Sequence, residues 1–194
     1  MKKTWIVPGV IIGLIVILIL LFVGKYNSLV AKDEGVKTAW GQVQNVYQRR
    51  ADLIPNLVET VKGYATHEEQ TLTEVTEARA KATSITVTPA NAEQMAQFQN
   101  AQTGLTSALG KLLAISENYP DLKANQNFLE LQAQLEGAEN RITTERMRYN
   151  QTVQDYNTYL RSFPTNIVAN WFGFEKATVF QADAGADKVP QVKF

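Results

Sequence analysis

The residues that come closest to a catalytic motif are His67 and Glu68, which begin the zinc-protease pattern His-Glu-x-x-His. That pattern needs a second imidazole one helical turn later, and Thr71 stands at this position. The chain has one histidine and no cysteine, so it lacks most of the side chains that carry metal and general-base chemistry. We therefore expect no catalytic residues, no metal and no cofactor. The least favoured alternative is a hydrolase using Asp52, Glu59, His67 or Glu68.

Charge and motif content argue against two further classes of function. The 19 basic and 19 acidic residues cancel, so the chain lacks the positive excess that supplies most of the affinity for nucleic acid. It also lacks a P-loop, a dinucleotide-binding glycine pattern and a Gly-x-Ser-x-Gly elbow. We therefore expect neither a nucleic acid partner nor a small-molecule substrate.

An uncharged apolar segment, Trp5 to Val23, opens the chain. As a helix its 19 residues span about 28 Å, which matches a bilayer core. A cleaved signal peptide is the alternative, but the apolar part of such peptides is only about 7–15 residues long. Two lysines precede the segment and five basic residues follow it between positions 25 and 50, so the charges leave its orientation open. We predict a single-pass membrane anchor over residues 1–25.

Gly9 and Gly13 lie four residues apart within this segment. Such spacing lets two membrane helices approach closely, so we expect membrane-helix packing and a homo-oligomer. The alternative is that these glycines have no role in association.

Apolar residues recur at helical spacing in four stretches of the remaining chain, at about residues 36–64, 68–83, 88–119 and 121–163. Pro55 interrupts the first stretch and is expected to kink the helix locally. We assign Thr66 and Glu69 to a capping box, Thr88 to an N-cap, and Asp121 to another. Short connections between such helices favour an all-α fold, an elongated antiparallel four-helix bundle over residues 26–163.

Two charged residues interrupt the apolar stripes, Arg50 in the first helix and Glu145 in the last. A buried charge is costly unless it is paired. We expect the two to form a buried ion pair that sets helix register, either with each other or with nearby charges. The alternative is that each side chain turns outward to solvent.

Residues 164–194 are expected to form a short amphipathic helix and an extended tail. Aromatic residues gather at its start, and aromatic side chains are favoured at membrane–water interfaces. This segment is therefore expected to lie on the membrane, to support assembly, or to cap the open end of the bundle. The residues concerned are Phe163, Trp171, Phe172 and Phe174.

The chain resembles the LemA family over nearly its whole length. The longest shared run is Arg49-Arg50-x-Asp52-Leu53-Ile54-Pro55-Asn56-Leu57-Val58-Glu59-Thr60-Val61-Lys62-Gly63-Tyr64-Ala65-x-His67-Glu68, and shorter matches include Tyr26-Asn27, Ala39-Trp40, Tyr119-Pro120, Glu139-Asn140-Arg141-Ile142, Phe163-Pro164 and Gly173-Phe174. The family pattern often has Tyr-Phe where this chain has Val179-Phe180. The resemblance implies a bacterial membrane protein with one transmembrane helix and a four-helix domain, without an established activity or ligand.

Two functional hypotheses follow. The first is a non-enzymatic, self-assembling scaffold anchored in the bilayer of the bacterial cell envelope. The second is an adaptor that presents part of its bundle to a membrane protein such as a protease or transporter. The surface expected to meet that partner comprises Arg49, Asp52, Asn56, Glu59 and His67.

Overall fold

The computed structural model describes residues 6–181 and, within the first helix, side chains from Pro8 onward. The described residues form six helices and no strand, so the all-α prediction is confirmed. The part of the predicted membrane segment before Ile6 and the part of the predicted tail after Gln181 lie outside the described residues. The helices are α1 (Ile6–Lys62), α2 (Glu69–Ser84), α3 (Ala92–Ser116), α4 (Pro120–Lys123), α5 (Gln126–Arg161) and α6 (Thr165–Phe172).

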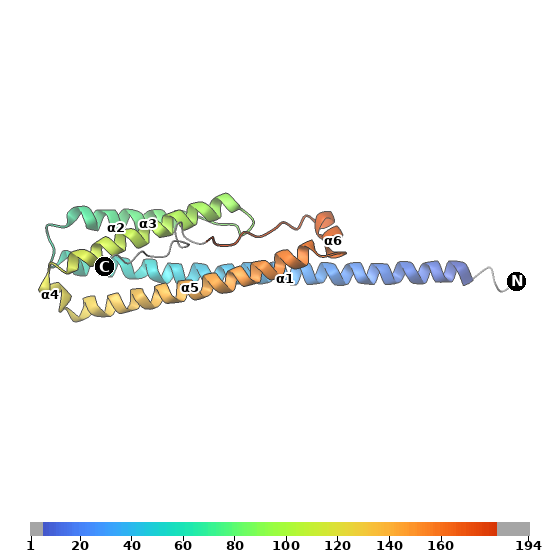
Figure 1. The fold of residues 1–194 in the computed structure, drawn as a ribbon, viewed down its shortest axis with the longest axis horizontal. Helices are drawn as coiled ribbons and strands as arrows, with labels where there is room; N and C mark the ends of the chain where they lie inside the picture. The colour runs from blue at the N-terminus through green and yellow to red at the C-terminus, as the bar shows by residue number, and fades with distance from the viewer. Residues whose placement is uncertain (1–5, 182–194) are drawn as a thin grey trace, which may run out of the picture.

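The molecule is a long rod (Figure 1). Helix α5 runs antiparallel beside α1, while α2 and α3 form a shorter antiparallel pair that covers the end of α1 farthest from the N-terminus. Helix α6 lies against α1 and the end of α5, at the level where the bundle gives way to the free N-terminal part of α1. The four-helix bundle is thus complete only in the far half of the rod.

Helix α1 is continuous over 57 residues, or about 86 Å. Its N-terminal part is long and apolar enough to cross a membrane, and none of its most apolar 18-residue stretch is buried within the protein. The apolar segment therefore joins the bundle directly, without an intervening linker.

Pro55 lies inside α1 without ending it. A proline lacks the N–H that would bond the carbonyl four residues earlier, which here is the carbonyl of Ala51. The Arg79 Nε atom of α2 donates to that oxygen at 2.7 Å. The lost helical hydrogen bond is therefore replaced by a side chain from the neighbouring helix, which ties α2 to α1.

The core consists of two clusters that follow one another along the rod. The span-side core cluster lies near the membrane segment, and residues of α1 and α5 form its centre, including Val36, Trp40, Val43, Tyr149 and Val153. Residues of α3, of α6 and of the segment after α6 complete it. The far core cluster lies among the four bundle helices and includes Ile54, Leu57, Leu105, Leu112 and Leu135.

An extended segment, residues 174–181, runs back along α5 and completes the span-side half of the rod. We call it the strap. The Asn157 amide donates to the Ala177 carbonyl at 2.8 Å and accepts from the Ala177 N–H at 3.0 Å. Seven residues earlier, Asn150 bonds both main-chain groups of Phe180 in the same way, at 3.1 and 2.8 Å. Two asparagines thus pair with the strap backbone much as a neighbouring strand would.

Two tyrosines of α5 add to this contact. Tyr149 donates to the Thr178 carbonyl at 2.9 Å, and Tyr156 donates to the Glu175 carbonyl at 2.8 Å. Burial raises the pKa of Tyr156 to about 12 and the pKa of Tyr149 well above its usual value. Both hydroxyls therefore keep the proton that each donates.

Three predicted helix starts are wrong. The N-cap residue of α2 is Glu68, which makes no side-chain capping bond, so the Thr66–Glu69 box does not form. Helix α3 starts after Asn91, whose side chain accepts from the Gln94 N–H, because Thr88 and Pro89 belong to the preceding turn. Asp121 lies inside the short helix α4, and α5 is capped by Asn125 instead.

Mutagenesis can test whether the Arg79 hydrogen bond replaces the one that Pro55 cannot make. Arg79→Met should lower the free energy of unfolding by about 1–3 kcal/mol, because it leaves the Ala51 carbonyl without a partner. In a Pro55→Ala background the restored N–H can bond that carbonyl, so the same substitution should cost less. Chemical denaturation of the four proteins measures the difference, and equal costs in both backgrounds would contradict this account.

Candidate functional site

A polar layer separates the two core clusters, centred on Arg50 of α1. The Arg50 side chain is 2% exposed and lies between the apolar neighbours of both clusters. Its Nη1 atom donates to Glu139 Oε2 of α5 at 2.7 Å and to Thr106 Oγ1 of α3 at 3.0 Å. Its Nη2 atom donates to Gln102 Oε1 of α3 at 2.5 Å. One guanidinium thus joins three helices.

The polar layer extends to α2, the remaining helix of the bundle. The Gln102 Nε2 atom donates to the Ala82 carbonyl near the end of α2, at 3.3 Å. The Arg50 guanidinium also lies over the Tyr47 ring, 5.3 Å from its centroid. The Nε atom of Arg50 is buried without a hydrogen-bond partner. The interior is therefore polar at one level of the rod. Most hydrogen-bonding groups of Arg50 and Gln102 are used in bonds between helices.

The charged partner of Arg50 is Glu139; of the two expected arrangements, direct pairing with Glu145 is not the one found. Glu145 lies farther along α5, where it accepts a hydrogen bond from Arg148 at 3.2 Å. The Arg50–Glu139 pair is half open to solvent, since the Glu139 side chain is 49% exposed. It matches the expected pairing of Arg50 with a nearby charge, whereas direct pairing with Glu145 does not occur.

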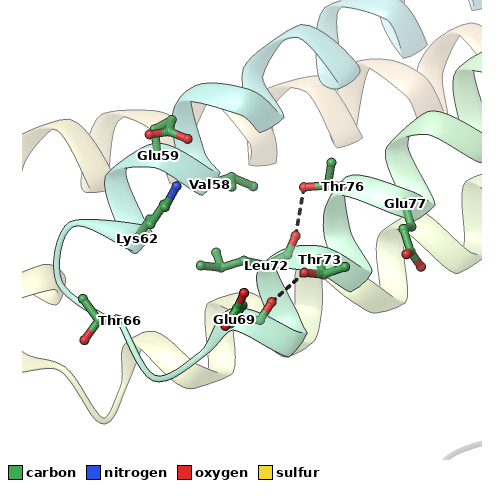
Figure 2. Close-up of a pocket in the computed structure, with 9 residues that line it drawn as sticks. All are labelled: Val58, Glu59, Lys62, Thr66, Glu69, Leu72, Thr73, Thr76 and Glu77. Carbon is green, nitrogen blue, oxygen red and sulfur yellow. Dashed lines mark hydrogen bonds between the residues drawn. The ribbon is translucent and has the colours of Figure 1, made fainter.

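A concavity of about 580 Å³ lies at the far end of the rod, where α1 ends and α2 begins (Figure 2). Val58 and Leu72 form its apolar part, and charged and hydroxyl side chains surround them. Thr73 and Thr76 bond carbonyls of their own helix at 2.8 and 2.9 Å. Its remaining lining residues are Glu59, Lys62, Thr66, Glu69 and Glu77.

The expected partner surface is brought together only in part. Arg49, Asp52, Asn56 and Glu59 are all exposed and follow one another at helical spacing along a single face of α1. Of these, Glu59 lines the concavity at the far end. Arg49 lines a separate cavity of about 240 Å³ between α1 and α5, which includes Arg141. His67 is exposed in the loop that follows α1.

Two of the three carboxylates considered for a hydrolase, Asp52 and Glu68, are engaged in other contacts. Asp52 accepts from Gln48 at 2.7 Å on its own helix. Glu68 accepts from the Tyr119 hydroxyl at 3.1 Å, and burial with this carboxylate nearby raises the pKa of Tyr119. Within the described residues no group of three or more metal-ligating side chains could hold an ion.

The aromatic residues near α6 gather around the end of the apolar segment of α1. The Trp171 ring meets the Phe22 ring edge-on at a centroid distance of 6.3 Å. Tyr26 lies between Phe172 and Phe174, at 4.7 and 6.0 Å. Contacts from α6 thus reach both sides of the level at which the uncharged segment ends.

Gly9 and Gly13 lie on the exposed part of α1. A Cβ atom added at either position would meet no atom within 4 Å. The backbone at this face is therefore open to a neighbour of any kind.

Several residues that organise the structure had no sequence signal strong enough to single them out. Glu139 stands in the polar run Glu139-Asn140-Arg141, and Gln102 and Thr106 carry no charge that would mark them as partners of Arg50. Phe180, the second residue of the Val179-Phe180 pair, is buried, and its ring centroid lies 5.9 Å from that of Trp40 and 5.5 Å from that of Tyr149. Asn150 and Asn157, which hold the strap, also stand in no pattern that would single them out.

Two double-mutant cycles distinguish the partners of Arg50. Arg50→Ala combined with Glu139→Ala should give a coupling energy of about 0.5–3 kcal/mol in the free energy of unfolding, as for residues in one network. Arg50→Ala combined with Glu145→Ala should be additive to within about 0.5 kcal/mol. Denaturant titration of the variants measures both cycles. Additivity in the first cycle, or strong coupling in the second, would contradict the structure.

Comparison of the sequence with known proteins finds relatives over most of the chain. The chain is 26% identical to Protein LemA of Metamycoplasma hominis, over 83% of this chain and 71% of that protein. It is 25% identical to Magnetosome protein MamQ 2 of Paramagnetospirillum magneticum and 23% identical to Magnetosome protein MamQ of Magnetospirillum gryphiswaldense, in each case over 84% of this chain and 67% of the relative. The LemA family model matches residues 39–194, about four-fifths of the sequence. The chain belongs to the LemA family.

Proposed function

We propose that this protein is a non-enzymatic scaffold of the bacterial cell envelope that is anchored by α1 and assembles with copies of itself. The observation that carries the proposal is the continuity of α1 from the apolar segment into the bundle. A flexible linker would let the bundle move freely over the membrane, whereas an unbroken helix transmits the position of its membrane segment to the domain.

Helix α1 connects the membrane segment to a surface a long way from the bilayer. About 35 residues separate Val23, at the end of the apolar segment, from Val58 in the concavity. At 1.5 Å per residue they hold the concavity about 50 Å from the bilayer edge. A rod that presents a surface at a set height suits a structural role.

Self-assembly is assigned to the glycine face of the membrane segment. Glycines four residues apart remove the side chains that would keep two helix backbones apart, and the face around Gly9 and Gly13 is open. Within a bilayer, another membrane helix of the same kind can therefore pack closely against it.

This assembly is tested by the mass of the full-length protein in mild detergent. We expect a defined particle of two or more chains, and we expect Gly9→Ile with Gly13→Ile to shift it toward the monomer because the added side chains separate the backbones. Leu18→Phe is the matched control, since Leu18 lies on the opposite face of the same helix. Light scattering after size-exclusion chromatography measures the masses. A monomeric wild-type protein would rule out self-assembly through this segment.

The concavity at the far end favours a second function, that of an adaptor for another envelope protein. Its apolar base with a charged surround has the composition of a protein-binding surface, in which a buried apolar centre is enclosed by polar groups. Charged side chains from both α1 and α2 contribute, including Glu59, Lys62 and Glu77.

Site-specific photo-crosslinking in cells tests the adaptor function. A photoreactive residue at Thr73, inside the concavity, should crosslink to a second kind of polypeptide. The same residue at Met147, which is exposed on α5, should not, because it lies outside the concavity. Mass spectrometry of the products identifies the partner. Crosslinks from Thr73 only to further copies of this chain would contradict the adaptor and favour the scaffold.

A further inference from the structure

Helix α6 carries apolar side chains on two sides. Its inner side, with Thr165, Val168 and Ala169, is buried against α1 and α5. Its outer side presents Ile167 and Trp171, with 44% and 76% of their surface exposed. A helix on the surface of a soluble domain normally has a polar outer side. The outer side of α6 is apolar and is exposed, so it is expected to contact another apolar surface.

The uncovered residues form one patch. Ile167 and Trp171 lie four residues apart on α6, and the Phe172 ring lies 6.4 Å from the Trp171 ring between centroids. Phe163 lies in the turn directly before the helix. Phe163 is 81% exposed and Phe172 is 58% exposed. Elsewhere on the described bundle, exposed large apolar side chains such as Tyr64, Leu129 and Met147 are far apart in the sequence. Contiguous exposed apolar surface of this kind marks a binding surface.

The position of the patch identifies what covers it. Trp171 contacts Phe22 at 6.3 Å, one residue before the end of the uncharged segment of α1. The segment is about as long as a bilayer core is thick, so Phe22 lies at one edge of that core when the segment spans it. The outer side of α6 is therefore continuous with the lipid-facing surface of α1.

The chemistry of the patch matches this position. Tryptophan and phenylalanine are favoured in the boundary between headgroups and acyl chains, where helices with one apolar side lie parallel to the membrane. Lys25 follows the end of the apolar segment and lies over the Tyr159 ring at 5.5 Å. A lysine at this level places its charge among the headgroups.

We propose that α6 lies in the interface of the same bilayer that α1 spans, with Phe163, Ile167, Trp171 and Phe172 in contact with lipid. The inference rests on the membrane anchor of the proposed function and adds a second membrane contact to it. Because α6 is packed on both α1 and α5, this contact sets how deeply α1 inserts and how the rod stands on the membrane.

Spin labels in the full-length protein, reconstituted in phosphatidylcholine vesicles, test the proposal. The chain has no cysteine, so a single Ile167→Cys substitution gives one labelled site. Leu129→Cys is the matched control, because Leu129 is also 44% exposed but lies near the far end of the rod. Leu14→Cys, within the apolar segment, reports on the anchor itself.

Collisions of each label with oxygen, which dissolves in lipid, and with a water-soluble nickel complex are compared. The ratio of oxygen to nickel collisions should be severalfold higher at Ile167→Cys than at Leu129→Cys, and highest at Leu14→Cys. Equal ratios at positions 167 and 129, with a high ratio at position 14, would overturn the interfacial α6 while leaving the anchor intact. A low ratio at position 14 would overturn both.

A third result also decides the question. If the label at position 167 meets neither oxygen nor nickel, a protein surface covers it, and the lipid contact is wrong. Far-ultraviolet circular dichroism of each labelled protein, compared with the wild type, shows whether the helices are retained.

Discussion

The charge of Arg50 is the constraint on which the arrangement of the bundle depends. A guanidinium cannot lose its proton in a protein, so an arginine with 2% exposure must find acceptors among its neighbours. It finds them on α3, through Gln102 and Thr106, and on α5, through Glu139. A shift of either helix by one turn would carry these acceptors away, about 5.4 Å along the rod. A single side chain thus fixes the relative heights of three helices.

That register reaches both ends of the molecule. Once α5 is fixed on α1, its last residues lead α6 to the level of Phe22 and Tyr26, where the uncharged segment ends. At the other end, α2 is held by the Arg79 contact to the Ala51 carbonyl, one residue after Arg50. The concavity and the aromatic patch are therefore set at fixed places on one continuous helix, although no residue of either contacts Arg50.

The sequence predicts the helices well because each stripe of apolar residues has to be buried, and their spacing identifies the buried side. Arg50 is visible for the same reason, as a charge within such a stripe. Its partners are not visible, since Glu139 lies at the edge of the buried side and reaches inward only in the folded bundle. The strap is equally hidden. Asn150 and Asn157 recognise backbone groups, which every residue has, so no complementary side chain marks the segment they hold.

The use of polar groups in the interior bears on what kind of protein this is. An active site keeps some buried polar side chains available for a substrate. Here the buried polar side chains mostly bond the protein itself: Arg50 and Gln102 join helices, and Ser116 bonds the Leu113 carbonyl. The partly buried Asn150 and Asn157 hold the strap. The concavity and the aromatic patch, the two surfaces proposed to bind other molecules, lie on the outside and about 50 Å apart along α1. In this molecule the interior hydrogen bonds fix the positions of the helices, and the two proposed binding surfaces lie far apart. Such a molecule is suited to holding a partner at a set distance from a membrane.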